Sequence, residues 1–294
     1  MFLPGLEGDC RIQVDVGKKR ASARFIRSFE DQTRSDMRFA RILSVAVTGC
    51  VFASFALHHA ASQTQASMPT KRDAAPVLVV GFMGGFVHSN DLRHSELQIA
   101  RQIQSQYGDR VRVQIFENRH RADAHKWIEQ QLREEDGVHS FHEERPRPRI
   151  VLFGHSWGAS AVVYLARELQ HDGIPVDLTI QVDSIRKNRK DDSIIPANVF
   201  QAINFYQTGG LLRGRTTITA ADPSRTRILG NVRLTYEKLP RECRAYPWHD
   251  RLVFKGHTAI ECDPRVWSQV EHLISMQLPA DATQPGIETA FVSH

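Results

Sequence analysis

This chain has no concentrated tract of positive charge. Its formal net charge is +5, but residues 1–68 carry 9 lysines and arginines against 6 acids, and the remainder carries 29 against 27. That remainder contains no stripe of basic residues interleaved with aromatic ones, which is the footprint of a nucleic-acid-binding surface. We therefore expect no nucleic-acid partner. Repeats and low-complexity tracts are absent too, and the composition is that of an ordinary globular protein.

The sequence also lacks a clear metal-binding motif, although it contains 14 histidines. The densest group is His139, His142, Glu143 and Glu144. It falls in a charged, proline-bounded segment rather than on a helix, so the geometry of a helical H-E-x-x-H zinc site is missing. We interpret this group as a solvated loop and expect no metal.

Long apolar runs are scarce as well. The longest, residues 42–57, holds sixteen mostly apolar residues, whereas a transmembrane helix needs about 20. A basic start at Met37-Arg38-Phe39-Ala40-Arg41 precedes this run, and small residues follow it, as in a secretory signal peptide. We therefore predict that residues 37–66 direct export, to the periplasm or out of the cell. We interpret residues 1–36, which show no clear periodicity, as a mis-called extension.

Two other interpretations of residues 37–66 stay open. The segment is a membrane anchor if it is not cleaved, and membrane contact would then be confined to it. It is a lipoprotein leader if Cys50 is acylated, because Val47-Thr48-Gly49-Cys50 resembles a lipobox. Beyond this segment only Cys243 and Cys262 remain. These two cysteines form one disulfide in an oxidising compartment or stay unpaired.

Strand-like and helix-like segments alternate after a short polar linker, residues 67–75. Segments with apolar or alternating patterns predict strands at 75–80, 111–116, 149–153, 176–182 and 202–206, and shorter strands at 216–219 and 232–236. Helical spacing predicts helices at 97–107, 122–132, 159–170 and 265–276. Asp263 and Pro264 are predicted as the N-cap and the first residue of the last of these. This alternation predicts an α/β fold, a three-layer α/β/α sandwich with a mostly parallel sheet. Residues 208–250 are interpreted as a small insertion and residues 279–294 as a tail.

The chain is organised around Gly154-His155-Ser156-Trp157-Gly158, which lies between a predicted buried strand and a predicted helix. A G-x-S-x-G in that context is the pattern of a nucleophile elbow. The serine is held on a sharp, strained turn, and a Cβ at Gly154 or Gly158 would clash with the neighbouring strand or helix. The bare string is weak evidence, but the strand before it and the helix after it make the signal strong.

A serine nucleophile needs a histidine base and a carboxylate that orients it, in the chain order Ser, acid, His. Asp183 is the predicted acid, because it directly follows the first strand after the elbow helix. His257 is the predicted base, because it follows an apolar run and precedes the last helix. The rival acids and bases are Asp191, Asp192, Asp222, Asp250, His249 and His272.

Acyl transfer also needs backbone donors aimed at the developing oxyanion. The N–H of Trp157, the residue after the nucleophile, is the first expected donor. The second is expected from Phe82 or Met83, in a glycine-rich turn after the first strand. Gly81 and Gly84 in this turn would let the backbone approach the substrate carbonyl.

Together these residues resemble an α/β-hydrolase of the serine esterase, lipase or thioesterase type, over residues 76–278. The resemblance implies a minimal version of that fold, because the chain starts at what would be the third strand of the full sheet. It implies an acyl-enzyme on Ser156, with His257 as general base and acid and Asp183 as orienter. No cofactor is implied. The expected substrate is a small-molecule or lipid acyl ester. The alternatives are a thioesterase or amidase on the same triad, or a non-catalytic hydrolase-like binding module.

Overall fold

The computed structural model describes residues 12–14, 75–138, 147–187 and 190–278. The strands of its main sheet are β1 (Ile12–Val14), β2 (Val77–Met83), β3 (Val111–Glu117), β4 (Ile150–His155), β5 (Val176–Val182), β7 (Val199–Gln207) and β9 (Arg227–Leu234). The helices are α2 (Ser95–Tyr107), α3 (Arg121–Val138), α4 (Trp157–His171), α5 (Trp248–Val253), α6 (Lys255–Glu261) and α7 (Pro264–Ser275). Shorter elements are the strands β6 (Ile194–Ile195) and β8 (Thr219–Ala220) and the 3-10 turns η1 (Gly108–Arg110) and η2 (Arg241–Ala245).

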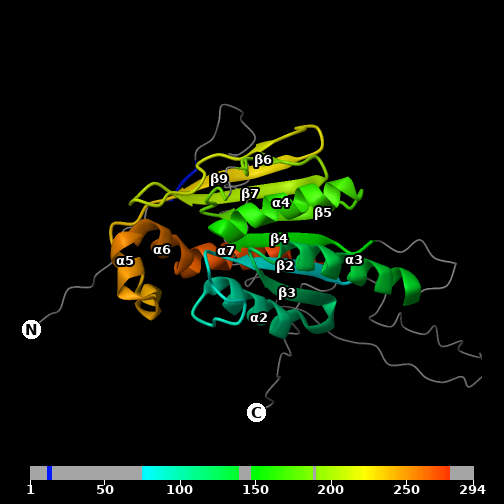
Figure 1. Cartoon of the computed structure of the whole chain (residues 1–294), viewed down its shortest axis with the longest axis horizontal. Coiled ribbons are helices and arrows are strands. Elements are labelled where there is room, and N and C mark those ends of the chain that lie inside the picture. The colour runs from blue at the N-terminus through cyan, green and yellow to red at the C-terminus, as the bar shows by residue number, and fades with distance from the viewer. Residues whose placement is uncertain (1–11, 15–74, 139–146, 188–189, 279–294) are drawn as a thin grey trace, which may run out of the picture. The chain divides into compact units, whose positions relative to one another are not determined.

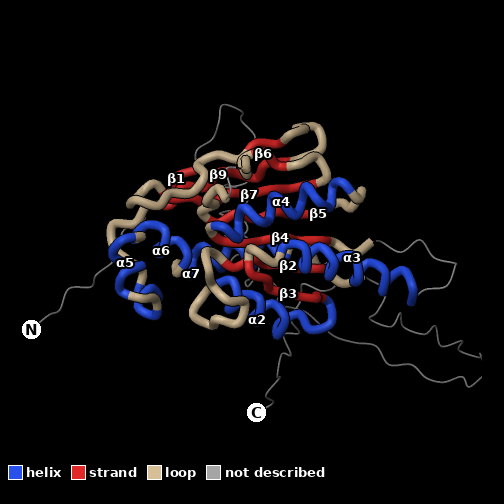
Figure 2. The backbone as a smooth tube through the Cα atoms, viewed as in Figure 1, coloured by secondary structure: helices blue, strands red, loops and turns tan. Residues whose placement is uncertain are grey.

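The main sheet has the strand order β1-β9-β7-β5-β4-β2-β3. All neighbouring strands run parallel except β1, which pairs antiparallel with β9. Helices cover both faces of the sheet (Figure 1), and Figure 2 shows the strands enclosed between them. The predicted three-layer sandwich with a mostly parallel sheet is therefore confirmed.

The two faces of the sheet follow from the period of two along each strand. In β2, Val77 and Val79 belong to the cluster formed with α2 and α7, whereas Leu78 and Val80 belong to the cluster formed with α3 and α4. Both sets are buried, so these strands are apolar throughout, as expected for a parallel sheet covered on both faces. The core thus consists of two layers, one on each side of the sheet.

The strand order places a binding crevice at one position. β3 lies on one side of β2, and the chain then crosses to β4 on the other side. Ligands of open parallel sheets bind where the connections diverge in this way, beyond the carboxyl ends of the strands. The loop after β2 and the turn after β4 therefore flank the expected crevice. α5 and α6 lie at this end of the sheet (Figure 1).

The last helix confirms a prediction made from its first residues. Asp263 accepts a hydrogen bond from the backbone N–H of Arg265, and Pro264 is the first helical residue. Proline suits that position because its missing N–H would have no partner within the helix. The side chain of Asp263 satisfies one of the N–H groups that the helix leaves free.

Residues 208–250 are not simply an insertion, which corrects the prediction. Within them, Arg227–Leu234 is β9, a strand of the main sheet that pairs with β7 over most of its length. Its pattern is weak because Gly230 and Asn231 interrupt the apolar alternation, and only Val232 and Leu234 are buried.

The predictions for the two ends fall largely outside the described residues. The export segment 37–66 and the tail 279–294 lie outside them, as does most of the linker 67–75. Within 1–36, only Ile12–Val14 is described, and it pairs with β9. Among the helices of the described residues, none has the length and hydropathy of a membrane span.

Candidate active site

Ser156 lies at the turn between β4 and α4. Its backbone adopts φ 58° and ψ −123°, a left-handed conformation that costs an ordinary side chain energy. The turn is held because the Ser156 N–H donates to the Val182 carbonyl, at 3.0 Å, on the neighbouring strand β5. The strand–turn–helix geometry expected of a nucleophile elbow is therefore present around this serine.

The two glycines that flank Ser156 make room for this turn. A Cβ on Gly154 would lie 2.7 Å from the backbone carbon of Gly158. A Cβ on Gly158 would lie 2.1 Å from the carbonyl oxygen of Phe82 in β2. Both distances are far below any carbon contact, so α4 can start beside β2 only with glycine at these positions.

Ser156, His257 and Asp183 form one hydrogen-bonded chain. His257 Nε2 lies 2.9 Å from Ser156 Oγ, and His257 Nδ1 lies 2.7 Å from Asp183 Oδ2. Asp183 is fully buried, and the other two are 6% and 8% exposed. A carboxylate accepts only, so Nδ1 carries the proton that faces Asp183 and Nε2 is left to accept from the serine hydroxyl. This is the arrangement that makes a serine nucleophilic.

The position of His257, between an apolar run and the last helix, predicts a loop, but the residue is the third of the short helix α6. Its rival His249 is mostly exposed. Asp192, a rival acid, is buried but accepts from Ser184 and Arg215.

Asp183 is held by two residues that the sequence analysis missed. The Gln207 side-chain amide donates to Asp183 Oδ2 at 2.8 Å, and the Gly214 N–H donates to Oδ1 at 2.9 Å. Gln207 is the last residue of β7, the strand next to β5. A polar residue at the carboxyl end of the strand next to β5 was a signal for such a partner, because the carboxyl ends of parallel strands lie at the same edge of the sheet.

The loop after β2 begins later than predicted. β2 continues through Met83, because Phe82 pairs with Gly154 and Met83 pairs with Glu117 on the flanking strands. Gly81, Phe82 and Met83 are thus strand residues, not turn residues.

Gly84 is the loop residue that approaches Ser156. A Cβ at this position would lie 3.2 Å from the Ser156 Cβ. Trp157 is the first residue of α4, so its N–H has no acceptor within the helix. Trp157 with Phe82 or Met83 as oxyanion donors stays a prediction.

A small cavity opens beside the elbow. Its volume is about 170 Å³, and its lining includes Phe86, Asn118, Trp157 and Lys187. The rings of Phe86 and Trp157 meet edge to face with centroids 5.1 Å apart, and the Lys187 ammonium lies 5.2 Å from the Trp157 ring centre. Arg119 lines the cavity too, so the cavity offers aromatic surface and two cations to a group bound next to Ser156.

A second set of titratable side chains is buried behind the serine–histidine pair. We call it the His/Glu cluster; its members are His94, Glu96, His155 and Glu261. The ring of His155 lies against that of His257, with centroids 4.4 Å apart. Burial lowers the pKa of His155 to about 4. Burial raises the pKa of Glu96 to about 8, and the neighbouring Glu261 adds to that rise.

Cys243 and Cys262 are joined by a disulfide with their Cα atoms 5.2 Å apart. The bond links η2 to the residue that follows α6, the helix of His257. With Tyr246 and the half-buried Leu239, the two cysteines form a small apolar cluster of their own. The disulfide therefore closes a segment of chain that carries the histidine of the site.

No protein-family model and no curated protein matches the chain. Solved structures that resemble it include RedJ, a thioesterase from the prodiginine biosynthetic pathway in Streptomyces coelicolor, with 14% identity and a TM-score of 0.35 over 68% of this chain and 91% of that chain. A cutinase-like protein from Cryptococcus sp. has 11% identity and a TM-score of 0.35 over 70% of this chain and 95% of that chain. A hyperthermophilic esterase from the archaeon Pyrobaculum calidifontis has 12% identity and a TM-score of 0.32 over 68% of this chain and 76% of that chain. Likeness at this level establishes neither family nor function, so the site stands on its own geometry.

Proposed function

We propose that the protein is an exported serine hydrolase that cleaves carboxylic (acyl) esters. One observation carries the proposal: the hydrogen-bonded chain from Ser156 through His257 to Asp183. Its support is that three residues far apart in the sequence, on three different elements, meet in the geometry that activates a serine. A binding module without activity has no need of that geometry.

The reaction follows from the contacts of the three side chains. The Ser156 hydroxyl attacks the acyl carbonyl while its proton passes to His257 Nε2. His257 then gives this proton to the leaving alcohol oxygen as the carbonyl–oxygen bond breaks, which leaves an acyl-enzyme. A water molecule attacks this ester by the same route and releases the acid and the free serine. Asp183 holds the imidazole in the required tautomer throughout.

The triad does not by itself choose the leaving group. A thioesterase or an amidase would use the same three residues, and both remain alternatives to an esterase. The cavity beside Trp157 is small and lined with aromatic surface, which favours a compact apolar group next to the nucleophile. Export is supported by the Cys243–Cys262 disulfide, since such bonds persist in oxidising compartments.

A fluorophosphonate probe and a p-nitrophenyl ester series, from acetate to palmitate, test this proposal. The wild-type protein should be labelled at Ser156 and should hydrolyse at least the shorter esters. Ser156→Ala should lose both the label and the turnover. Ser160→Ala is the matched control, because this serine lies one turn further along α4 and donates to the Trp157 carbonyl; it should keep both.

Two outcomes would redirect the proposal. Labelling of Ser156 with no turnover of oxygen esters would move the assignment to thioesters or amides, tested with the matching thioester and anilide. Absence of labelling in folded protein, judged by circular dichroism, would refute the serine mechanism and favour the binding module.

A further inference from the structure

The segment that follows β5 connects the triad to the cavity beside the elbow. It begins with Asp183, the acid of the candidate triad. Two residues further on, the Ile185 N–H donates to the Ser156 carbonyl at 3.2 Å. Lys187, two residues after that, lines the cavity together with Trp157. The segment is therefore tied to Ser156 midway between its acid and its lysine.

Lys187 is held at both its backbone and its side chain. Its carbonyl accepts a hydrogen bond from the Tyr164 hydroxyl at 3.2 Å. Its ammonium donates to Asn118 Oδ1 and lies over the Trp157 ring. Asn118 is only 4% exposed, and its side-chain nitrogen donates to two backbone carbonyls, one at the end of β2 and one in the loop after it. Ordering a lysine side chain costs entropy, so these contacts preorganise the ammonium at the cavity.

The charge of Lys187 has no acidic partner. In the part of the chain that the structure describes, its ammonium forms no ion pair, and its hydrogen-bond acceptor is the neutral amide of Asn118. Burial lowers the pKa of Lys187, and the charges of Arg121 and Arg119 lower it further. Both effects oppose the positive charge, so an anion bound beside the ammonium would relieve them. An ammonium has three N–H donors, which leaves donors for such a ligand.

The other charged side chains of the cavity are engaged with one another. Arg119 and Glu117 both line it and form an ion pair. Glu117 Oε1 also hydrogen-bonds to His88 Nδ1 at 2.9 Å. The lining therefore carries one cation more than it carries anions, and Lys187 is the cation without a counter-ion.

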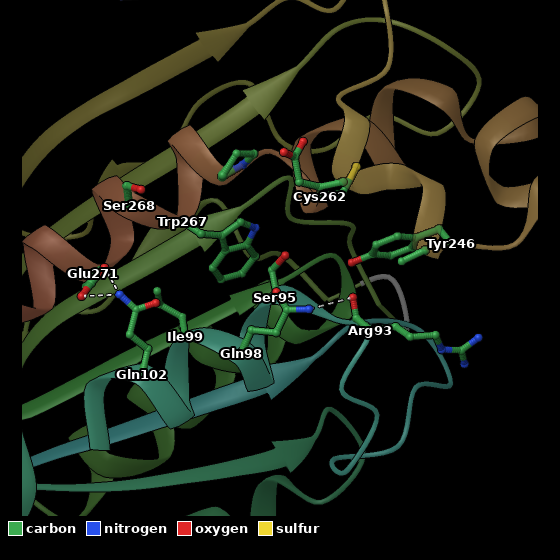
Figure 3. A pocket seen from close by; sticks show the side chains of 13 residues that line it. Arg93, Ser95, Gln98, Ile99, Gln102, Tyr246, Cys262, Trp267, Ser268 and Glu271 are labelled. Atoms are coloured by element: carbon green, nitrogen blue, oxygen red, sulfur yellow. Dashed lines mark hydrogen bonds between the residues drawn. The ribbon is translucent and has the colours of Figure 1, made fainter. Parts of the chain in front are cut away.

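A larger pocket of about 210 Å³ offers no comparable site (Figure 3). Its charged lining residues are Arg93, Glu242 and Glu271. Arg93 donates to the Asp91 carboxylate at 2.6 Å, and Glu271 accepts from the Gln102 side chain at 2.9 Å. No member of the triad is among its lining residues. An anion would meet an excess of acidic groups there and would lie away from Ser156.

We propose that Lys187 binds a carboxylate of the substrate in the cavity beside Trp157. The aromatic walls suit a short apolar stem, and the ammonium suits the anion that the stem carries, through charge-assisted hydrogen bonds. The substrate class is thus an ester with a negatively charged group close to the bond that is cleaved, on its acyl or its alcohol side. This inference rests on the proposed hydrolysis and specifies its substrate.

Matched pairs of esters test the inference on the full chain. On the acyl side, p-nitrophenyl hydrogen adipate is compared with p-nitrophenyl hexanoate. On the alcohol side, 4-acetoxybenzoate is compared with its methyl ester. The measured quantity is the ratio of kcat/KM for the charged ester to kcat/KM for the neutral one. We expect Lys187→Met, which keeps the length of the side chain, to lower this ratio about 10-fold in at least one pair. High salt should lower the wild-type ratio in that pair.

Lys190→Met is the matched control. Lys190 is an exposed lysine of the same segment, its ammonium lies 6.0 Å from the centre of the Tyr164 ring, and it does not line the cavity. This variant should keep the wild-type ratio in both pairs. A ratio that Lys187→Met leaves unchanged in both pairs overturns the inference. The proposed function survives that result if Ser156→Ala abolishes the hydrolysis of the neutral esters.

Failure of the proposed function gives a different result, because neither ester of either pair is then hydrolysed. The lysine is in that case tested by calorimetric titration with adipate and with 4-hydroxybenzoate. Weaker binding to Lys187→Met than to the wild type supports the carboxylate site, whereas equal binding or no binding to both refutes it. Lys187→Gln replaces Lys187→Met if circular dichroism shows that the latter does not fold.

Discussion

Two residues of the candidate triad carry unusual backbone conformations. Ser156 and Asp183 have φ angles of 58° and 46°, and in the described part of the chain no other residue except glycine has a positive φ. Conformations of this kind persist only where the surrounding structure enforces them, and they gather at functional sites. Each is anchored by a backbone hydrogen bond to a neighbouring strand, from Ser156 to Val182 and from Asp183 to Phe205.

Gly158 is the glycine at which an added methyl group should destabilise the fold most. In Gly158→Ala the new Cβ would lie 2.1 Å from the Phe82 carbonyl oxygen, so α4 would have to move away from β2. We expect a loss of about 3 kcal/mol in the free energy of unfolding, measured by urea denaturation. Gly230→Ala is the control, because its Cβ would meet nothing nearer than 3.8 Å. Equal stability of the two variants would contradict the packing described.

Gln207 should act on catalysis through Asp183. Gln207→Met keeps the volume but removes the amide that donates to the Asp183 carboxylate. Hydrogen bonds to charged groups contribute about 1.5–3 kcal/mol, so we expect kcat to fall roughly 10- to 100-fold. KM should change little, since Gln207 is buried behind the acid. A change in KM alone, with kcat intact, would show that Gln207 does not position Asp183.

At the scale of elements, the disulfide is the constraint on α6. It closes a loop across a sequence separation of 19 residues that contains His257. Closing a loop of this size is worth about 3 kcal/mol in the chain-entropy model. We expect the Cys243→Ser/Cys262→Ser variant to melt at a lower temperature than the wild type.

Treatment with a reductant distinguishes the loss of the disulfide from other effects of the Cys243→Ser/Cys262→Ser substitution. Dithiothreitol should lower the melting temperature of the wild type and leave that of the double variant unchanged. A wild type whose melting temperature does not respond to complete reduction would contradict a stabilising role for the bond.

At the scale of the whole molecule, the question is how much of the chain the fold requires. β1 contributes three residues to the edge of the sheet, and the remaining strands and the site come from residues after 76. We expect a chain of residues 69–294 to keep fluorophosphonate labelling of Ser156 and to lose only a few degrees in melting temperature. Loss of the folded state on this truncation would make β1 an essential strand and argue against cleavage after residue 66.

Much of the fold was predictable because its signals are local. Strand β2 and most of β4 are apolar on both faces, β5 alternates apolar and polar residues, and Asp263 and Pro264 mark the start of α7. Only the end of β9 was predicted, as a short strand over 232–236, because Gly230 and Asn231 break the apolar alternation before it. The rest of the strand is recognised through its pairing with β7. β2 ran past its predicted end for the same reason: partners on both sides extend a strand through residues that, taken alone, favour a turn.

The sequence by itself determined the α/β architecture, the elbow at Ser156 and the choice of Asp183 and His257 as partners. These follow from periodicity, from the glycines that a strained turn demands, and from chain order. Only the tertiary structure decided which polar groups support them. Gln207 and Gly214 reach Asp183, and the His/Glu cluster unites residues 94, 96, 155 and 261. Such groups meet only once the sheet has aligned the ends of its strands, so no local pattern encodes them.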